Sequence, residues 1–361
     1  MSDFKGKRIA GLTPYTPGEQ PKDRKYIKLN TNESPYPPSR KAIKYAAEAA
    51  NTVMLYSDPQ CVKLRCALAN QYGVPAECII CGNGSDDILN FAFSAFCDED
   101  TPAVFADITY GFYPVFAEYN RVPARIIPLK DDFTLTPSDY YNAGGTVFIA
   151  NPNAPTGIAL CRDEIEEIIK NNKDNVVVID EAYVDFGAQS CVPLTKKYKN
   201  LLVTQTFSKS RSLAGARLGF GIADPSLIQD LETVRYSTNP YNVNSMTAAA
   251  GIGSLEDQAY TDENCKKIIK TRENAKKELE KLGFSVTSSS ANFLFAKHES
   301  ISGERIYTRL REKGVLVRHF SSPRIKDHNR ITVGDDTQMT ALVNALKEIT
   351  DEKRTDNTKN R

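Results

Sequence analysis

Several short segments of the sequence are apolar at nearly every position, and amphipathic segments separate them. The apolar segments are residues 78–82, 101–107, 124–129, 146–150, 175–180 and 200–207, with "TVFIA" and "NVVVID" among them. Between them lie segments with helical periodicity, such as "SDDILNFAFSAFC" and "RDEIEEIIKNN". Strands that are apolar on both sides have to be buried on both faces. Their alternation with helices predicts an α/β fold with a three-layer α/β/α domain and a mostly parallel sheet.

The two ends of the chain differ from this pattern. Residues 1–39 are rich in proline and polar groups and predict an N-terminal arm, after which residues 40–262 hold the large domain. A long charged helical stretch then leads into residues 263–350, where strands and helices alternate in a smaller α/β C-terminal domain. Residues 351–361 are polar throughout, so we expect a disordered tail there.

The charge balance gives no reason to expect a nucleic acid or an anionic membrane as a partner. The 361 residues include 46 basic and 45 acidic side chains, which nearly cancel. No run of about 18 apolar residues occurs, and the N-terminus lacks the apolar stretch of a signal peptide. We therefore expect a cytoplasmic protein in which any recognition of anions is local.

Metal and disulfide chemistry have weak support in the sequence. The eight cysteines lie in apolar or helical contexts, which favours reduced thiols in the core. Cys78 and Cys81 form a single CxxC inside a predicted strand, without the second CxxC of a zinc site. The three histidines, His298, His319 and His328, lack HxxxH spacing. We expect no bound metal.

The residues that follow the apolar segments are unusual in four places. In an open parallel sheet, ligands bind beyond the carboxyl ends of the strands, so these positions are candidates for a site. They read "GNGSDD" (82–87), "NPNAPTG" (151–157), "DEAY" (180–183) and "SK" (208–209). The first leads into a helix, whose free amides can hold a phosphate, although such a segment can also be a simple turn and helix cap.

Asp180 and Lys209 each allow two interpretations. Asp180 ends a fully apolar strand, where it either caps the following turn or pairs with a buried cation such as a protonated pyridine nitrogen. Lys209 either reaches the surface or is desolvated, loses its proton readily and forms a Schiff base with a carbonyl. A phosphate, an aldehyde and a ring nitrogen that needs an acid together describe pyridoxal 5′-phosphate.

The motifs "YSDPQCVKLRCALANQYG", "GNGSDD", "NPNAPTG", "VIDEAYVDF", "TFSKSRSLAGARLGF" and "RITVG" have the order and spacing of one enzyme family. In this respect the chain resembles the fold-type I, class II aminotransferases, and within them most closely the histidinol-phosphate aminotransferase group. The resemblance extends from about residue 12 to residue 349. It implies a pyridoxal-phosphate enzyme that takes a small-molecule amino donor, here histidinol phosphate, and a 2-oxo acid acceptor.

The resemblance assigns roles around the cofactor ring. Lys209 holds the cofactor as the internal aldimine and then moves the proton between Cα of the substrate and the cofactor. Asp180 pairs with the pyridinium nitrogen, and Tyr183 hydrogen-bonds the phenolic oxygen. Tyr110 stacks on the ring face, the alternative being a core aromatic at the start of a helix.

The resemblance also implies a phosphate cup and a second subunit. The cup consists of Gly84, Ser85, Asp86, Thr206, Ser208 and Arg217. Tyr56, in "LYSDP", matches a position that reaches the phosphate of the neighbouring subunit, which implies a homodimer with shared active sites. Arg211 receives no role, and we expect it to be solvated at the surface.

One departure from the family pattern concerns the cofactor site, and a second, Asp87 where the family usually has Glu, is conservative. The family commonly has Asn directly before "PTG", bonded to the phenolic oxygen, whereas this chain has Ala154 there and Asn153 one position earlier. We hypothesise that Asn153 reaches this oxygen by a slightly different loop path, with Tyr183 as the other donor.

Four further residues match the substrate site of the family. Arg330, in "NRITVG", is at the position that binds the α-carboxylate, and Arg318, in "GVLVRHF", is the second arginine, suited to a phosphate dianion. Tyr15 and Asn32 belong to the arm that covers the substrate, or merely pack on the domain. Alternatives are an aromatic amino-acid aminotransferase, a threonine-phosphate decarboxylase, or a catalytically idle binding protein of the same fold.

Overall fold

The apolar segments of the sequence form one seven-stranded sheet in the computed structural model, which describes residues 4–359. The strands run in the order β2 (Ile79–Gly82), β8 (Gly219–Ala223), β7 (Leu201–Thr206), β6 (Val177–Asp180), β5 (Thr146–Ala150), β3 (Ala103–Ala106) and β4 (Ala124–Ile127). All are parallel except β8, which pairs antiparallel with both of its neighbours. The mostly parallel sheet predicted from the sequence is confirmed. The antiparallel β8 begins at the last two residues of "TFSKSRSLAGARLGF", and no strand was predicted there.

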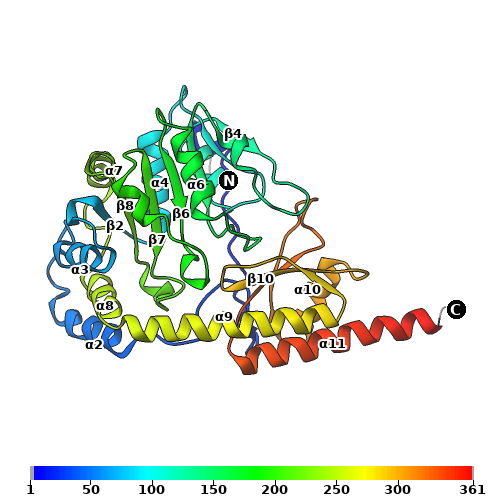
Figure 1. Cartoon of the computed structure of the whole chain (residues 1–361). Helices are drawn as coiled ribbons and strands as arrows, with labels where there is room; N and C mark the ends of the chain where they lie inside the picture. Colours follow the sequence, from blue (N-terminus) through cyan, green and yellow to red (C-terminus); the bar gives the residue numbers. More distant parts are fainter. Residues whose placement is uncertain (1–3, 360–361) are drawn as a thin grey trace.

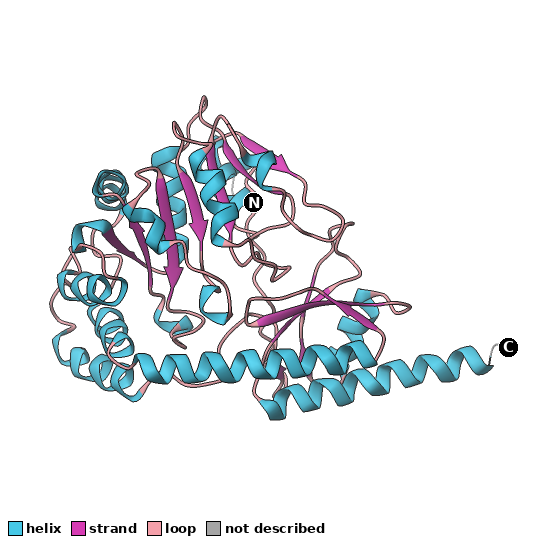
Figure 2. Cartoon of the chain, in the orientation of Figure 1, coloured by secondary structure: helices cyan, strands magenta, loops and turns pink. Residues whose placement is uncertain are grey.

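Helices cover both faces of this sheet (Figure 2). Alternate strand residues point to opposite faces: Val147 and Ile149 belong to one apolar cluster, and Phe148 belongs to the other. The first cluster includes residues of α3 (Val62–Tyr72), α6 (Arg162–Lys170) and α8 (Ser245–Leu255). The second includes residues of α4 (Ser85–Phe96), α5 (Tyr113–Asn120) and α7 (Pro225–Thr238). The predicted three-layer α/β/α domain is therefore present.

A smaller domain is built on a second, antiparallel sheet of four strands. Their order is β12 (Arg318–His319), β13 (Asn329–Thr332), β10 (Phe293–His298) and β9 (Phe284–Val286). The helices α10 (Gly303–Glu312) and α11 (Asp336–Lys359) pack on it around an apolar cluster that includes Leu310 and Leu346. The chain thus combines a parallel and an antiparallel sheet.

One long helix, α9 (Gln258–Lys281), passes from the large domain to the small one (Figure 1). It follows α8 directly and ends beside β9, with α11 alongside. The domain boundary that we placed between residues 262 and 263 falls inside this helix, because the charged helical stretch continues across it without a break.

The C-terminal helix α11 differs from the expected disordered tail. It continues through residues 351–359, and residues 360–361 lie outside the described part of the chain. Arg309 of α10 donates to both carboxylate oxygens of Glu352 at 2.8 Å, which holds the start of this segment against the domain. Adding residues to a helix that is already nucleated is favourable enough to extend it beyond the packed part.

The N-terminal arm has little regular structure. It contains α1 (Lys7–Ala10) and β1 (Ile27–Lys28), which pairs with β11 (Val315–Leu316) of the small domain. The arm then joins α2 (Arg40–Ala49), which packs on α8. Short 3-10 helices lie at Ala50–Thr52, Ala76–Cys78, Pro137–Tyr140, Val184–Phe186, Val192–Lys196 and Ala214–Ala216.

The structure also shows the state of the cysteines and the apolar content of the helices. All eight cysteines are free thiols; five are buried, whereas Cys66 and Cys161 are exposed and so are not the core thiols we expected. Within residues 4–359, no helix has both the length and the apolar content needed to cross a membrane.

Candidate active site

A pocket lies at the carboxyl ends of β5, β6 and β7, beside the start of α4. We call it the central pocket. It is lined by Ser85, Asp86, Tyr110, Ala150, Pro152, Ala154, Asp180, Ala182, Tyr183, Thr206, Ser208, Lys209 and Arg217. Three of the four strand-end motifs that the sequence singled out contribute polar side chains to it, as expected for a sheet of this kind.

Lys209 is at the base of this pocket, directly after β7. Its Nζ donates to the backbone carbonyl of Thr31 in the arm at 3.2 Å and lies 5.7 Å from the centre of the Tyr183 ring. Burial, followed by the nearby charge of Arg330, lowers the pKa of Lys209 to about 8. A sizeable fraction of this amine is therefore unprotonated near neutral pH and can act as a nucleophile or a base.

Asp180 lines the same pocket from the end of β6 and is buried. Its carboxylate accepts hydrogen bonds from the hydroxyls of Tyr113 at 3.3 Å and Thr204 at 3.4 Å and from the amide of Ala182 at 3.2 Å. Burial, with a smaller contribution from Asp86, raises the pKa of Asp180 to about 7. A buried acid with this pKa would be stabilised by a cationic group of a ligand.

Two glycines and a cluster of donors form a cup beside Lys209. Gly84 has φ +83°, and a Cβ there would lie 2.5 Å from Nη2 of Arg217; a Cβ on Gly219 would lie 2.2 Å from the amide nitrogen of Ser85. Only glycine permits this close approach of the loop, the arginine and the start of α4. Arg217 also contacts the Ser208 hydroxyl at 3.5 Å and pairs with Asp86 at 3.0 Å. The cup thus combines a helix N-terminus with a guanidinium and hydroxyls, which suits an anion.

Two tyrosines and the arm close the pocket. The Tyr110 hydroxyl donates to Asp86 at 2.8 Å. The Tyr183 hydroxyl accepts from the side-chain amide of Asn32 at 2.9 Å. Asn32 is buried, its backbone has φ +56°, and its carbonyl accepts from Asn292 of the small domain at 3.0 Å. The arm therefore contacts two pocket residues directly, Tyr183 through Asn32 and Lys209 through Thr31.

The two arginines expected at the substrate site face each other across strands. Arg318 of β12 and Arg330 of β13 are directly paired in the antiparallel register. Nη2 of Arg330 donates to the carbonyl of Asn30 at 3.1 Å, whereas its buried Nε has no hydrogen-bond partner among the described residues. Arg318 donates to the carbonyls of Thr16 and Pro17 in the arm. Like charges placed opposite each other are unfavourable unless an anion or other acceptor offsets them.

Tyr15 is near this pair but is only loosely held. Its ring stacks on Phe112 at a centroid distance of 4.2 Å, and it remains 36% exposed. Tyr15 also contributes to the electrostatic environment of Arg330. The ring is thus partly accessible to solvent.

Asn153 does not belong to the central pocket, contrary to our hypothesis. Its side-chain amide donates to the carbonyl of Ile108 at 3.0 Å and to the Thr156 hydroxyl at 3.1 Å, and it lines a different cavity. These two acceptors hold the side chain on the far side of the loop. Ala154 lines the central pocket instead, so Tyr183 has no amide partner from this loop on the pocket side.

Arg211 is buried, and our expectation of a solvated side chain is wrong. Its guanidinium donates to the carbonyl of Ser254 at 3.3 Å and to Gln258 at 2.8 Å, and it lies 5.4 Å from the centre of the Phe207 ring. These contacts connect the loop of Lys209 to the junction of α8 and α9, where two acceptors compensate the buried charge.

Tyr56 lies away from the central pocket of its own chain. It is 84% exposed and stacks on Tyr241 at a centroid distance of 4.6 Å. Its neighbours Val53, Met54 and Leu55 are also exposed. A single chain thus leaves an aromatic and aliphatic surface uncovered at this place.

Sequence analysis missed two groups that contact Asp180. Thr204 could have been found, because its position in β7 places it opposite Asp180 in the parallel register. Tyr113 has no comparable signal, since its hydroxyl reaches Asp180 from the first turn of α5 through tertiary packing. Glu181 is also buried, and its carboxylate accepts hydrogen bonds from the Ser190 hydroxyl at 2.7 Å and from the side-chain amide of Gln205 at 2.8 Å.

Comparison with protein families gives one match over most of the chain. Residues 24–346 match the family described as aminotransferase class I and II. Two similar relatives are both called histidinol-phosphate aminotransferase. The protein from Brachyspira hyodysenteriae is 48% identical over 351 residues, which cover 97% of this chain and 99% of the relative. The protein from Marinomonas sp. is 50% identical over 351 residues, which cover 96% and 99%.

Solved structures share the fold. The histidinol-phosphate aminotransferase from Sinorhizobium meliloti, crystallised with pyridoxal-5′-phosphate, superposes with a TM-score of 0.89 and 24% identity and covers 98% of this chain and 99% of its own. A putative histidinol-phosphate aminotransferase from Erwinia carotovora atroseptica has a TM-score of 0.84 and 25% identity, covering 91% and 97%. At such identities the likeness supports the architecture of both domains and the arm.

Proposed function

Because the chain belongs to the aminotransferase class I and II family, we propose that it transfers the amino group of histidinol phosphate to 2-oxoglutarate, with pyridoxal 5′-phosphate as cofactor. The products are imidazole-acetol phosphate and glutamate, and the reaction is a step of histidine biosynthesis. The observation that carries this proposal is the 48–50% identity to histidinol-phosphate aminotransferases over nearly the whole chain. The aromatic and decarboxylase alternatives have no comparable support.

The residues of the central pocket fit this cofactor. Asp180 is a buried acid in need of a cationic partner, which the protonated ring nitrogen provides. The cup formed by Gly84, Ser85, Ser208 and Arg217 offers donors to a phosphate dianion. Lys209 lines the same pocket with an amine that deprotonates easily. Tyr110 and Tyr183 line the space between them. These residues, with Asp86 and Thr206, are the ones that we propose hold the cofactor.

The bound cofactor supplies an aldehyde that accepts the amino group and a protonated ring that withdraws electrons from the substrate Cα–H bond. In our proposal the protein moves the proton: Nζ of Lys209, with its lowered pKa, takes the proton from Cα of the amino donor and delivers it to the cofactor carbon that carries the aldehyde. A positioned base of this kind accelerates proton transfer by about 10²–10⁴-fold. Asp180 stays ionised once it faces a cation, and the Tyr113 and Thr204 hydroxyls support that charge.

Arg330 and Arg318 are our proposed anion site for the substrates. Their direct pairing across β12 and β13 places two positive charges side by side, which suits a phosphate dianion better than a single carboxylate. The Nε of Arg330, which has no hydrogen-bond partner in residues 4–359, can donate to that anion. The same guanidinium can bind the carboxylates of glutamate and 2-oxoglutarate, so both half-reactions can use one site. Tyr15 and Asn32 of the arm complete the wall.

We propose that the working form is a homodimer in which Tyr56 completes the partner's active site. The support is a group of exposed apolar side chains, most of them on or next to α2 and α3, and exposed apolar groups of this kind often mark an interface. Its members are Ile43, Val53, Met54, Leu55, Tyr56, Val62, Tyr236, Tyr241 and Met246. A second copy of the chain would bury them. The free thiols and the near-neutral charge also support our proposal of a cytoplasmic location.

The decisive experiment is a half-reaction screen of the cofactor-loaded enzyme. Histidinol phosphate, glutamate, phenylalanine, tyrosine and threonine phosphate are mixed separately with the enzyme, and absorbance reports conversion of the cofactor to its amino form. We expect fast conversion with histidinol phosphate and with glutamate. Rapid conversion with the aromatic amino acids but none with histidinol phosphate would refute the assignment. An Arg318→Ala variant should slow the reaction with histidinol phosphate more than the reaction with glutamate, because only the phosphate needs two cations.

A further inference from the structure

A second cavity, separate from the central pocket, lies behind the loop of residues 151–157. We call it the side cavity. Its volume is about 320 Å³, which is within the range of small-molecule sites. Lys209 and Asp180 do not line it, and Ala150 is the residue that it shares with the central pocket. The hydrogen bonds from Asn153 to Ile108 and Thr156 hold part of the wall between the two.

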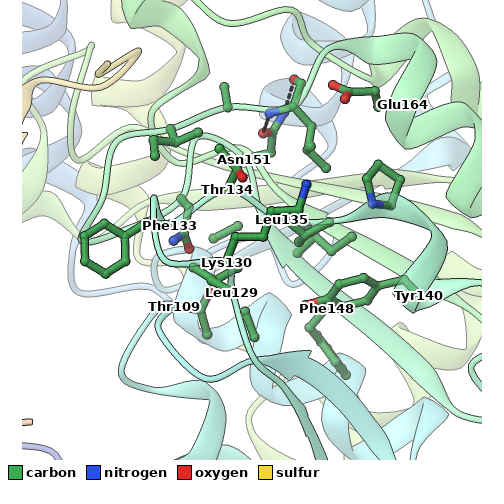
Figure 3. A pocket seen from close by; sticks show the side chains of 18 residues that line it. Thr109, Leu129, Lys130, Phe133, Thr134, Leu135, Tyr140, Phe148, Asn151 and Glu164 are labelled. Carbon is green, nitrogen blue, oxygen red and sulfur yellow. Dashed lines mark hydrogen bonds between the residues drawn. The ribbon is translucent and has the colours of Figure 1, made fainter. Parts of the chain in front are cut away.

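The side cavity combines apolar walls with two opposite charges (Figure 3). Leu129, Phe133 and Leu135 supply apolar surface. The side chain of Lys130 extends into the space, and Glu164 lies at its rim. Neither charge belongs to an ion pair within 4 Å in the part of the chain that is described. One oxygen of Glu164 accepts from the amide of Cys161 at 2.8 Å, as a helix cap, and the other is available to a ligand.

Tyr140 gives an independent indication of a ligand. Its side chain has 0% exposure and lines the side cavity, yet its hydroxyl has no hydrogen-bond partner among the described residues. A buried hydroxyl without a partner is costly and uncommon in native proteins. A polar atom of a ligand in the cavity would satisfy it.

We propose that the side cavity binds a free α-amino acid with a planar side chain that carries a polar atom. The ligand's carboxylate pairs with Lys130, and its ammonium group pairs with Glu164. Its side chain packs among Phe133, Leu135 and Tyr140, where the polar atom hydrogen-bonds the Tyr140 hydroxyl. A simple anion would leave Glu164 and the apolar walls unused, whereas a zwitterion with a flat side chain uses all three features.

The inference goes beyond the proposed function, and binding calorimetry tests it. The holoenzyme is first reduced with borohydride, so that amines no longer exchange at Lys209. L-Histidine and L-tyrosine are the probes, and L-phenylalanine, which lacks a polar ring atom, is the comparison. We expect saturable binding of one of the two probes, and affinity for L-phenylalanine about tenfold weaker because one hydrogen bond is missing. Absence of binding by both probes would overturn the proposal.

Variants locate the binding. Lys130→Ala and Tyr140→Phe should each weaken binding of the probe about tenfold or more, whereas Lys173→Ala, at an exposed position, should not change it. Tyr140→Phe removes a hydroxyl without a protein partner, so the thermal unfolding temperature should stay the same or rise. All three variants should keep the half-reaction rates of the wild type, which separates failure of this proposal from failure of the proposed function. Unchanged affinity in Lys130→Ala would mean that the probe binds elsewhere.

Discussion

Replacing Asp180 with Asn should stabilise the cofactor-free protein while it disables the enzyme. Burial raises the pKa of Asp180 from 3.8 to about 7, so the folded state binds more protons than the unfolded chain between these values. The free energy of unfolding of the wild type therefore falls as the pH rises from about 4 to about 7. The difference between the two pKa values corresponds to about 4 kcal/mol lost at pH above about 7. Asn keeps the shape of the side chain and removes this cost.

The assay is denaturant unfolding of both cofactor-free proteins across that pH window. At pH about 4 we expect the two proteins to be nearly equally stable, and at pH about 8 we expect Asp180→Asn to be more stable by about 4 kcal/mol. Glu181 is buried beside it with a pKa of about 7, but it is present in both proteins, so its contribution cancels. Asp174→Asn, at an exposed position, is the matched control and should show no such pH dependence.

Adding the cofactor should reverse the order of stability of the two proteins. The wild-type carboxylate then pairs with the protonated ring, so the wild type should gain more stability from pyridoxal 5′-phosphate than the variant does. The variant should also lose most of its transamination rate. If Asp180→Asn were less stable than the wild type at high pH, or the difference were the same at every pH, the interpretation of Asp180 as a destabilised acid awaiting a cation would be refuted.

Three further outcomes are expected. The rate at which cofactor-free protein combines with pyridoxal 5′-phosphate should rise about tenfold per pH unit below about pH 8 and level off above it, because only unprotonated Lys209 reacts; a rate independent of pH would contradict its lowered pKa. Tyr56→Ala should leave the fold intact but weaken cofactor binding and dimer formation in equilibrium dialysis and sedimentation, whereas Tyr119→Ala, another exposed tyrosine, should do neither. Tyr113→Phe should lower kcat/KM about tenfold by removing a hydrogen bond to the ionised Asp180, and an unchanged value would show that this contact does not support the charge.

The sheet and the strand-end residues could be predicted because local patterns determine them. A strand such as Val177–Asp180, buried at every position, is typical of a covered parallel sheet, and the strand order then brings Asp180 and Lys209 to one edge. Strand β8 was missed because "GFGIA" contains two glycines and follows a loop of small residues, which weakens its β signal.

Side-chain direction within a loop could not be predicted from sequence. Asn153 lies one position from the site that the family uses, and its orientation depends on the carbonyl of Ile108, which belongs to a different part of the chain. Arg211 likewise looks like a surface cation in sequence, and it is buried because the junction of α8 and α9 provides two acceptors. Such contacts are tertiary and leave no periodic signal.

The arm has a consequence for how the protein is made. Asn32 contacts Thr332, which lies 300 positions further along the chain, and Thr31 accepts from Lys209, 178 positions on. A ribosome releases the arm long before either partner exists, so these contacts cannot form during most of synthesis. The wall of the cofactor site is therefore among the last parts of the protein to assemble, and a nascent chain that stops short of β13 cannot enclose its cofactor.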